Sequence, residues 1–369
     1  MPESPESTKL PSSTEGFFLR PEKIRAFVVG LIRWQYPELF PGFPGRSRAD
    51  MRLARLLSKR GIPDTQLRYI RDEAATIETL RSEFKALLNQ TQPGETLILY
   101  YSGHGAISMH GRPFFSSYDT DSRKIESAWF MDEVIQCLDA NFKGDRVLFL
   151  GDCCHSGAMG KLLEESPRSF EYASLCSTTA EDDSSGNWTF TESILLALNG
   201  DSLVPANEHK EITLHELAAF AKADMALFEE QRAVFTHSPD FPHAAPLSLV
   251  HKKRNTMKGL QTRLEVLWGE DWFKARIIAV REDSVKVHYI GFPATADEWI
   301  NLNRTRPVQS ALFHVGASIE AEWNGDWWEA EILDTSGYLH FVRFMNKSSA
   351  WDEWIGGKRI RLSRKVRFP

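Results

Sequence analysis

One histidine and one cysteine, 50 residues apart, each follow a short apolar segment of the sequence. His104 lies in the motif Tyr-Ser-Gly-His-Gly at 101–105, and Cys154 lies in Gly-Asp-Cys-Cys-His-Ser-Gly at 151–157. The apolar segments before them, 96–101 and 146–150, lack polar alternation, which is typical of buried parallel strands. The carboxyl ends of such strands meet at one edge of an α/β sheet, where ligands bind. The sequence therefore predicts one cleft that contains both side chains.

These two residue types in one cleft could act as a nucleophile and its base. A thiol with its ordinary pKa of about 8.5 is only slightly ionised at neutral pH, so a cysteine nucleophile needs a base beside it. His104 could take the thiol proton of Cys154 and then protonate the leaving amine of an acyl transfer. The N–H groups of Gly105 and Cys154 are candidate donors to the developing oxyanion. Either residue alone would be interpreted as structural.

Strand-like and helical patterns alternate between residues 25 and 250 and would position these strand ends. We expect strands at 25–31, 67–70, 96–101, 146–150, 171–176 and 245–250. We expect helices at 50–60, 77–88, 131–138, 190–198 and 214–230. Repeated βα units predict an α/β fold with a mostly parallel sheet and helices on both faces.

Length and composition limit the class of protein. The chain has 369 residues, a net charge of −6 and 42% hydrophobic residues, which favours two or three globular domains. No apolar segment reaches the roughly 18 residues of a membrane helix, and the first residues lack the features of a signal peptide. We therefore expect a cytoplasmic protein without a membrane partner. Its four cysteines are expected to be reduced.

The C-terminal part of the sequence contains an internal repeat. Eight of the eleven tryptophans lie after residue 257, and a shift of 55 residues aligns 264–306 with 319–361 with 13 identities. Such similarity indicates a duplication. Short aromatic-rich strands between polar turns predict two small all-β barrels, with Trp272, Trp299, Trp327 and Trp354 in their cores. The expected organisation is a disordered leader (1–22), the α/β domain (23–250), a linker (251–260) and barrels at 261–310 and 316–369.

The paired motifs resemble those of the caspase and metacaspase family of cysteine peptidases, most closely its metacaspase and bacterial orthocaspase branch. The spacing between histidine and cysteine is the one known for caspases. The resemblance covers about 23–250 and implies a caspase-like fold that cleaves protein or peptide substrates. It implies His104 as general base, Cys154 as nucleophile, and the amides of Gly105 and Cys154 as oxyanion hole. It assigns no role to Cys153 or His155.

The resemblance also implies a pocket for the residue before the cleaved bond. In metacaspases this pocket is acidic and selects Arg or Lys, and the matching positions here are Asp152, Ser102 and Asp50. Caspases select Asp instead, and Arg46 and Arg48 could line a pocket of that kind. We predict cleavage after Arg or Lys, because a guanidinium prefers a carboxylate partner. The alternative is that Asp152 caps its loop and Asp50 is a helix N-cap.

No cofactor and no metal site are predicted. Metacaspases often need calcium, so activation by calcium stays open, but the sequence has no convincing carboxylate cluster for it. The nearest candidate is the charged segment 181–183, which is equally typical of plain surface. The Cys-Cys-His triplet has no second ligand pair with zinc spacing.

The duplicated segments resemble the chromo barrel, Tudor-knot and wider Tudor-like group of SH3-like barrels. The resemblance implies an aromatic cage for a methylated lysine, or a surface for nucleic acid through basic residues such as Arg304 and Arg306. The matching cage positions are Phe273, Tyr289 and Phe292 in the first copy and Trp328, Phe344 and Trp351 in the second. Ala296 and Lys347 replace further aromatic residues. These rings could equally be ordinary barrel surface, and the ligand could be the peptidase domain itself.

Two function classes therefore stay open. The first is an endopeptidase whose C-terminal modules bind a substrate or a regulator. The second is a catalytically silent scaffold or reader that binds a methylated peptide or nucleic acid through the tandem barrels. The joint presence of His104, Cys154, their glycines and Asp152 favours the first.

Overall fold

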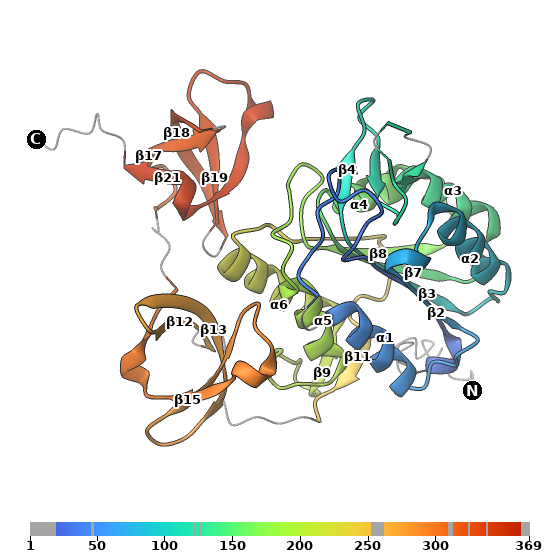
Figure 1. The fold of residues 1–369 in the computed structure, drawn as a ribbon, viewed down its shortest axis with the longest axis horizontal. Coiled ribbons are helices and arrows are strands. Elements are labelled where there is room, and N and C mark those ends of the chain that lie inside the picture. The colour runs from blue at the N-terminus through green and yellow to red at the C-terminus, as the bar shows by residue number, and fades with distance from the viewer. Residues whose placement is uncertain are drawn as a thin grey trace, which may run out of the picture.

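A six-stranded sheet in the order β10-β8-β7-β3-β1-β2 organises the first part of the chain (Figure 1). The computed structural model describes residues 20–45, 48–121, 123–124, 127–251, 262–308, 313–323, 325–336 and 339–362. All neighbouring strands of the sheet are parallel except β10, which is antiparallel to β8. The strands are β1 (Ile24–Gly30), β2 (Leu67–Arg71), β3 (Thr96–Ser102), β7 (Arg146–Asp152), β8 (Glu171–Cys176) and β10 (Val234–His237).

Helices cover both faces of this sheet, and each face has its own hydrophobic core. One face carries α2 (Ile77–Asn89), α3 (Met131–Asn141) and α4 (Ala158–Glu165). The other carries α1 (Ala49–Lys59), α5 (Thr189–Leu198) and α6 (Leu214–Asp224). Because both faces are covered, β1 and β3 are buried along their whole length. The predicted α/β fold class is confirmed.

The structure differs from the expected elements near the end of this domain. The helix expected at 214–230 ends at Asp224 and continues as a π-helical turn, Met225–Glu229. The strand expected at 245–250 is present as β11 (Pro246–Leu249), but it pairs with β9 (Glu211–Thr213) in a separate sheet. The strand at the β8 edge of the main sheet is instead β10, which the sequence did not reveal because it is short and only half-buried. A small sheet of β4 (Gly105–Ile107), β5 (Pro113–Phe115) and β6 (Trp129–Phe130) was also not predicted.

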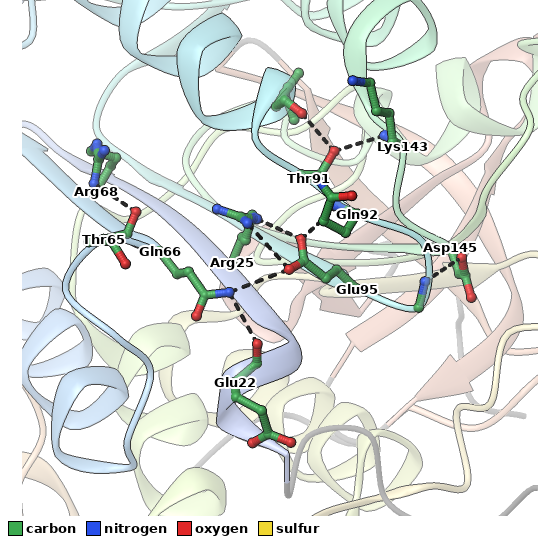
Figure 2. Close-up of polar contacts among 12 residues, drawn as sticks. Glu22, Arg25, Thr65, Gln66, Arg68, Thr91, Gln92, Glu95, Lys143 and Asp145 are labelled. Atoms are coloured by element: carbon green, nitrogen blue, oxygen red, sulfur yellow. Dashed lines mark hydrogen bonds and ion pairs between the residues drawn. The ribbon is translucent and has the colours of Figure 1, made fainter.

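A buried polar network holds the edge of the main sheet at which its parallel strands begin (Figure 2). Arg25 in β1 donates to Glu95, just before β3, at 2.6 Å, and these side chains are only 10% and 7% exposed. Glu95 also accepts the backbone N–H of Gln92 at 2.9 Å, and the amide nitrogen of Gln66 lies 3.5 Å from it. The network thus connects the beginnings of β1, β2 and β3.

Removal of the Glu95 carboxylate should destabilise the fold. We expect Glu95→Leu to lower the free energy of unfolding by about 3–5 kcal/mol, because it leaves the Arg25 guanidinium buried and unpaired. The double variant Arg25→Met/Glu95→Leu should recover most of the loss, since neither charge is then buried. Urea denaturation monitored by tryptophan fluorescence measures both values. A double variant as unstable as the single variant would contradict this explanation.

The C-terminal part forms two antiparallel sheets of five strands, each curled into a half-barrel. The first contains β12 (Arg263–Trp268), β13 (Asp271–Val280), β14 (Val285–Tyr289), β15 (Glu298–Ile300) and β16 (Thr305–Arg306). The second contains β17 (Ser318–Trp323), β18 (Asp326–Ser336), β19 (Leu339–Phe344), β20 (Glu353–Gly356) and β21 (Ile360–Leu362). Strand order and even the position of a bulge correspond in the two sheets, as expected for a duplication. Residues 1–19 of the expected leader (1–22) and most of the expected linker lie outside the described residues, whereas 21–23 form a 3-10 helical turn just before β1.

The prediction that four tryptophans fill the barrel cores is wrong. Trp272, Trp299 and Trp354 are only half-buried, and Trp327 is 37% exposed. An arginine guanidinium lies over each of these rings, 3.8–4.9 Å from its centroid. Stacked guanidinium groups stabilise indole faces at a surface, whereas mostly smaller side chains fill the narrow interior of each barrel.

Candidate active site

Adjacent parallel strands bring His104 and Cys154 to one edge of the main sheet. β3 and β7 pair in register up to Ser102 and Asp152, and each strand ends at that residue. His104 and Cys154 both follow two residues later, so the two loops emerge side by side. Both side chains line a pocket of about 80 Å³. The other lining residues are Leu31, Phe43, Ser102, Gly103, Asp152, Ser184, Gly186, Asn187 and Trp188.

The surroundings of His104 determine which ring nitrogen carries a proton. Its Nε2 lies 2.8 Å from the carbonyl oxygen of Pro41, which can only accept, so Nε2 is the donor. In the neutral ring the lone pair is therefore on Nδ1. The rings of Trp34 and Phe43 contact the imidazole at centroid distances of 4.5 Å. This burial lowers the pKa of His104, which keeps the ring neutral, and so able to accept a proton, at neutral pH.

Cys154 is a half-buried thiol at rest. Burial raises its pKa, and the backbone N–H of Ser184, 3.1 Å from the sulfur, opposes that shift. No hydrogen bond joins Cys154 to His104, although both lie in the described part of the chain. Catalytic hydrogen bonds are often long before substrate binds. The arrangement is thus a neutral thiol beside a neutral imidazole.

Gly105 lies directly against the backbone of the nucleophile loop. A Cβ atom at this position would be 2.1 Å from the carbonyl oxygen of Cys154, far inside van der Waals contact. The two backbones can approach this closely only because residue 105 has no side chain. The amide groups of Gly105 and Cys154, the expected oxyanion donors, therefore belong to two tightly packed loops.

A methyl group at Gly105 should therefore damage activity. We expect Gly105→Ala to lower kcat/KM by about 10²–10³-fold, the loss typical for one oxyanion donor, because the Cys154 backbone must move. Overpacking should also cost about 1–3 kcal/mol of stability. Gly45→Ala is the matched control, since its new Cβ would meet its nearest neighbour at 3.5 Å. Full activity of folded Gly105→Ala would contradict this assignment of the loops.

The residues on either side of Cys154 lie outside the pocket and contribute to the packing and backbone conformation around it. Cys153 is 1% exposed and belongs to the core, where burial raises its pKa strongly. His155 has a left-handed backbone with a φ of 56°, and its Nδ1 lies 3.0 Å from the carbonyl oxygen of Ala180. Neither side chain lines the pocket.

The structure brings Asp152 and Ser102 to the pocket. Asp152 is 7% exposed and accepts the Thr191 hydroxyl at 2.5 Å. Burial raises the pKa of Asp152 to about 7, and the neighbouring negative charge of Glu229 adds to this shift. The pocket is therefore lined by a carboxyl group whose charge changes near neutral pH.

Asp50 does not line this pocket. It is fully buried and pairs with Arg48 at 2.6 Å, while the hydroxyl of Tyr69 donates to it at 2.8 Å. Arg48 also forms an ion pair with Asp72. Of the two arginines considered for an acidic substrate residue, Arg48 is thus neutralised within the core, and Arg46 lies outside the described residues.

Several residues around the pocket were not predicted as site residues. Thr191 is buried and bonds to Asp152, Trp188 forms part of the wall, and Pro41 contributes only its carbonyl oxygen. A backbone group has no signature in the sequence. The two βα motifs could not have indicated Glu229, because it is more than 70 residues from Cys154.

The candidate cage residues of the first barrel pack against one another. Tyr289 is fully buried, and its hydroxyl donates to Glu298 at 2.6 Å. The six ring separations among Trp268, Phe273, Tyr289 and Phe292 are 5.1–6.3 Å, which are contact distances for aromatic pairs. The cluster is thus filled by its own rings.

In the second barrel the chain supplies its own cation. The ammonium group of Lys347 lies 4.4 Å from the ring centroid of Trp328 and 4.5 Å from that of Trp351. Phe344 is only 2% exposed and belongs to the barrel core. An external methylated lysine would therefore have to displace Lys347.

The described residues contain no group of three or more His, Cys, Asp or Glu side chains arranged to hold a metal ion. Within the same ranges, no helix has both the length and the apolar character needed to cross a membrane.

The fold and the pocket define a class of protein. A parallel α/β sheet with an imidazole and a thiol at adjoining strand ends is a caspase-like arrangement. Residues 38–240, more than half of the chain, match the family model described as Caspase domain. The chain therefore belongs to the caspase-domain family of cysteine peptidases.

Individual proteins resemble this chain less specifically than the family model does. A solved structure of a protein from Geobacter sulfurreducens is similar over 62% of this chain and 100% of its own, with 16% identity and a TM-score of 0.46. No curated protein matches the chain.

Proposed function

We propose that this protein is a cysteine endopeptidase that cleaves after Arg or Lys with His104 as base and Cys154 as nucleophile. The observation that carries the proposal is the shared pocket, in which the imidazole, the thiol and the Asp152 carboxyl group line one cavity. Membership of the caspase-domain family supports the reaction class.

The reaction follows from the protonation states of the two side chains. Nδ1 of His104 takes the thiol proton as the Cys154 sulfur attacks the carbonyl carbon of the substrate, and the carbonyl oxygen becomes an oxyanion. The C–N bond then breaks, and the amine leaves with the proton from His104. Water, deprotonated by His104, attacks the thioester, the C–S bond breaks, and the thiol regains its proton.

The charges around the pocket support a basic residue before the cleaved bond. Asp152 and the nearby Glu229 are both acidic. A guanidinium or ammonium group of the substrate would stabilise the Asp152 carboxylate in place of the water that burial removes. An acidic residue would instead need an arginine partner, and Arg48 is already paired with Asp50 and Asp72.

A panel of fluorogenic peptides that differ only in the last residue tests the proposal. Arg and Lys peptides should be cleaved, whereas an Asp peptide should be cleaved at least about 100-fold more slowly, because like charges in a buried pocket repel. Labelling with an Arg-containing acyloxymethyl ketone, followed by mass spectrometry, should modify Cys154 and leave Cys153 free. Preference for Asp, or modification at Cys153, would overturn the proposal.

We further propose that neither barrel serves as a reader of methylated lysine in this arrangement of the chain. The support is that Phe292 and Lys347, at corresponding positions of the repeat, already fill the two aromatic clusters. Titration of the protein with a trimethyllysine peptide, followed by tryptophan fluorescence, should show no saturable change. Saturable binding would revive the reader alternative.

A further inference from the structure

A buried carboxylate joins the first barrel to the peptidase domain. Asp224, at the end of α6, is fully buried and accepts Arg263 at 2.7 Å and Arg276 at 2.5 Å from the barrel. The same carboxylate accepts the hydroxyl of Ser193 in α5 at 2.7 Å. In Figure 1, α5 and α6 lie between the barrels and the parallel sheet. One residue thus connects three parts of the molecule.

The two arginines are a special feature of the first barrel. Arg263 and Arg276 are directly opposite each other on β12 and β13, where like charges destabilise a sheet unless an anion lies between them. The corresponding residues of the second barrel are Ser318 and Glu331, which also face each other. The half-barrel fold therefore does not require the arginine pair, which instead matches Asp224.

Two short paths lead from this junction to the substrate pocket. In α5, Thr191 lies two residues before Ser193 and donates to Asp152. In the π-helical turn after Asp224, Glu229 accepts the hydroxyl of Thr189 and the side-chain amide of Asn187, a pocket residue, the latter at 2.9 Å. Each path combines side-chain hydrogen bonds with a short length of helical backbone, 191–193 in the first and 224–229 in the second.

A cavity borders the beginning of α5 on one side. This cavity of about 370 Å³ lies between α5 and the first barrel, with Thr189 and Glu192 among its lining residues. Trp188 lines both this cavity and the substrate pocket. Phe190 and Thr191 are fully buried on the other side of the helix, so the hydrogen bonds at Ser193 and Asp224 act together with that packing to position α5.

We propose that the first barrel supports the substrate pocket from outside its lining, and that Arg263 and Arg276 are positioning residues for Asp152. The arginines hold Asp224, Asp224 holds α5, and α5 places the Thr191 hydroxyl on the Asp152 carboxyl group. The inference rests on the proposed function, because it concerns the recognition of the basic substrate residue. It makes selectivity a property of the chain with its barrel in place.

Single variants of the full chain test this proposal. Arg276→Met should raise KM for an Arg peptide about tenfold, within the range of coupling between residues of one network, and leave kcat within about twofold. Alkylation of Cys154 by iodoacetamide, a neutral reagent that does not use Asp152, should keep its rate. The KM of Arg276→Lys should lie between those of the wild type and Arg276→Met, since lysine retains a positive charge opposite Asp224. Arg306→Met is the matched control, because Arg306 pairs with Glu265 and stacks on Trp272 within the same barrel.

Ser193→Ala covers the case in which Arg276→Met does not fold. It removes only the hydroxyl that links α5 to Asp224, and should also raise KM for the Arg peptide without slowing alkylation. An unchanged KM in folded Arg276→Met or Ser193→Ala would overturn the inference while leaving the proposed function intact. Equal losses of turnover and alkylation would overturn it too, since they indicate a general structural role. Failure of the wild type to cleave Arg and Lys peptides would refute the proposed function itself.

Discussion

Cys154→Ala is expected to lower kcat/KM for an Arg-containing fluorogenic peptide by at least about 10⁴-fold. The sulfur forms the covalent bond to the substrate, and no neighbouring group replaces it, because Cys153 is buried in the core. His104→Ala should cause a loss of similar size, since burial raises the pKa of Cys154 and leaves little thiolate without a base. The combined variant should be no worse than either single variant, because the two groups act as a unit.

The control for these variants is Cys153→Ala. It removes the adjacent thiol and should keep activity per folded molecule near that of the wild type. The measurements are initial rates at several substrate concentrations, with circular dichroism to verify folding. Substantial activity of Cys154→Ala would refute the assignment of the nucleophile, and a rate for the combined variant equal to the product of the single losses would refute a cooperating pair.

The second large effect concerns Asp152 and pH. For Arg and Lys peptides, kcat/KM of the wild type should rise as pH increases through about 7, because the carboxyl group must lose its proton to pair with the substrate cation. In Asp152→Asn, kcat/KM should no longer rise between about pH 6 and 8. At pH 8 it should be about 10²–10³-fold lower than in the wild type, the loss typical for one partner of a buried charge pair. A pH profile of the variant that still rises near pH 7 would contradict the assignment.

Stability supplies an independent measurement of the same pKa. Burial raises the pKa of Asp152 from 3.8 to about 7, so the folded state holds more protons than the unfolded state between these values. The contribution of this residue to stability is therefore most favourable below about pH 4 and declines as pH rises toward 7. Asp152→Asn, which never ionises, should be more stable than the wild type at pH 8 and similar to it at pH 4. Thermal unfolding at both pH values measures this difference.

The sequence predicted the parts of the site that depend on strand ends. His104 and Cys154 follow two apolar segments, and β3 and β7 are adjacent and in register as expected. Asp152 is the last residue of its strand, so its position follows from the same pattern. The repeat of 55 residues likewise predicted two β units of the same kind, and the strands of the two half-barrels correspond.

What the sequence did not reveal is the partner that each of several side chains and carbonyl groups takes in the folded chain. Asp50 has an acidic side chain at a matching position, yet its charge is used by Arg48, only two residues away. Tryptophans such as Trp272 look like core residues because they are large and apolar, but a stacked guanidinium allows an indole to lie at a surface. The carbonyl group of Pro41 and the carboxylate of Asp224 have no local pattern that indicates their partners.

The duplicated barrels illustrate how two copies of one sequence can cease to be interchangeable. Their strands correspond, so a recombination event that deleted one copy would still leave a well-formed half-barrel. If the remaining copy carried Glu331 where Arg276 had been, a carboxylate would face the buried Asp224. Two buried like charges would then repel at the junction with α5. Loss of the first copy is therefore expected to be far less tolerated in evolution than loss of the second, although both copies have the same architecture.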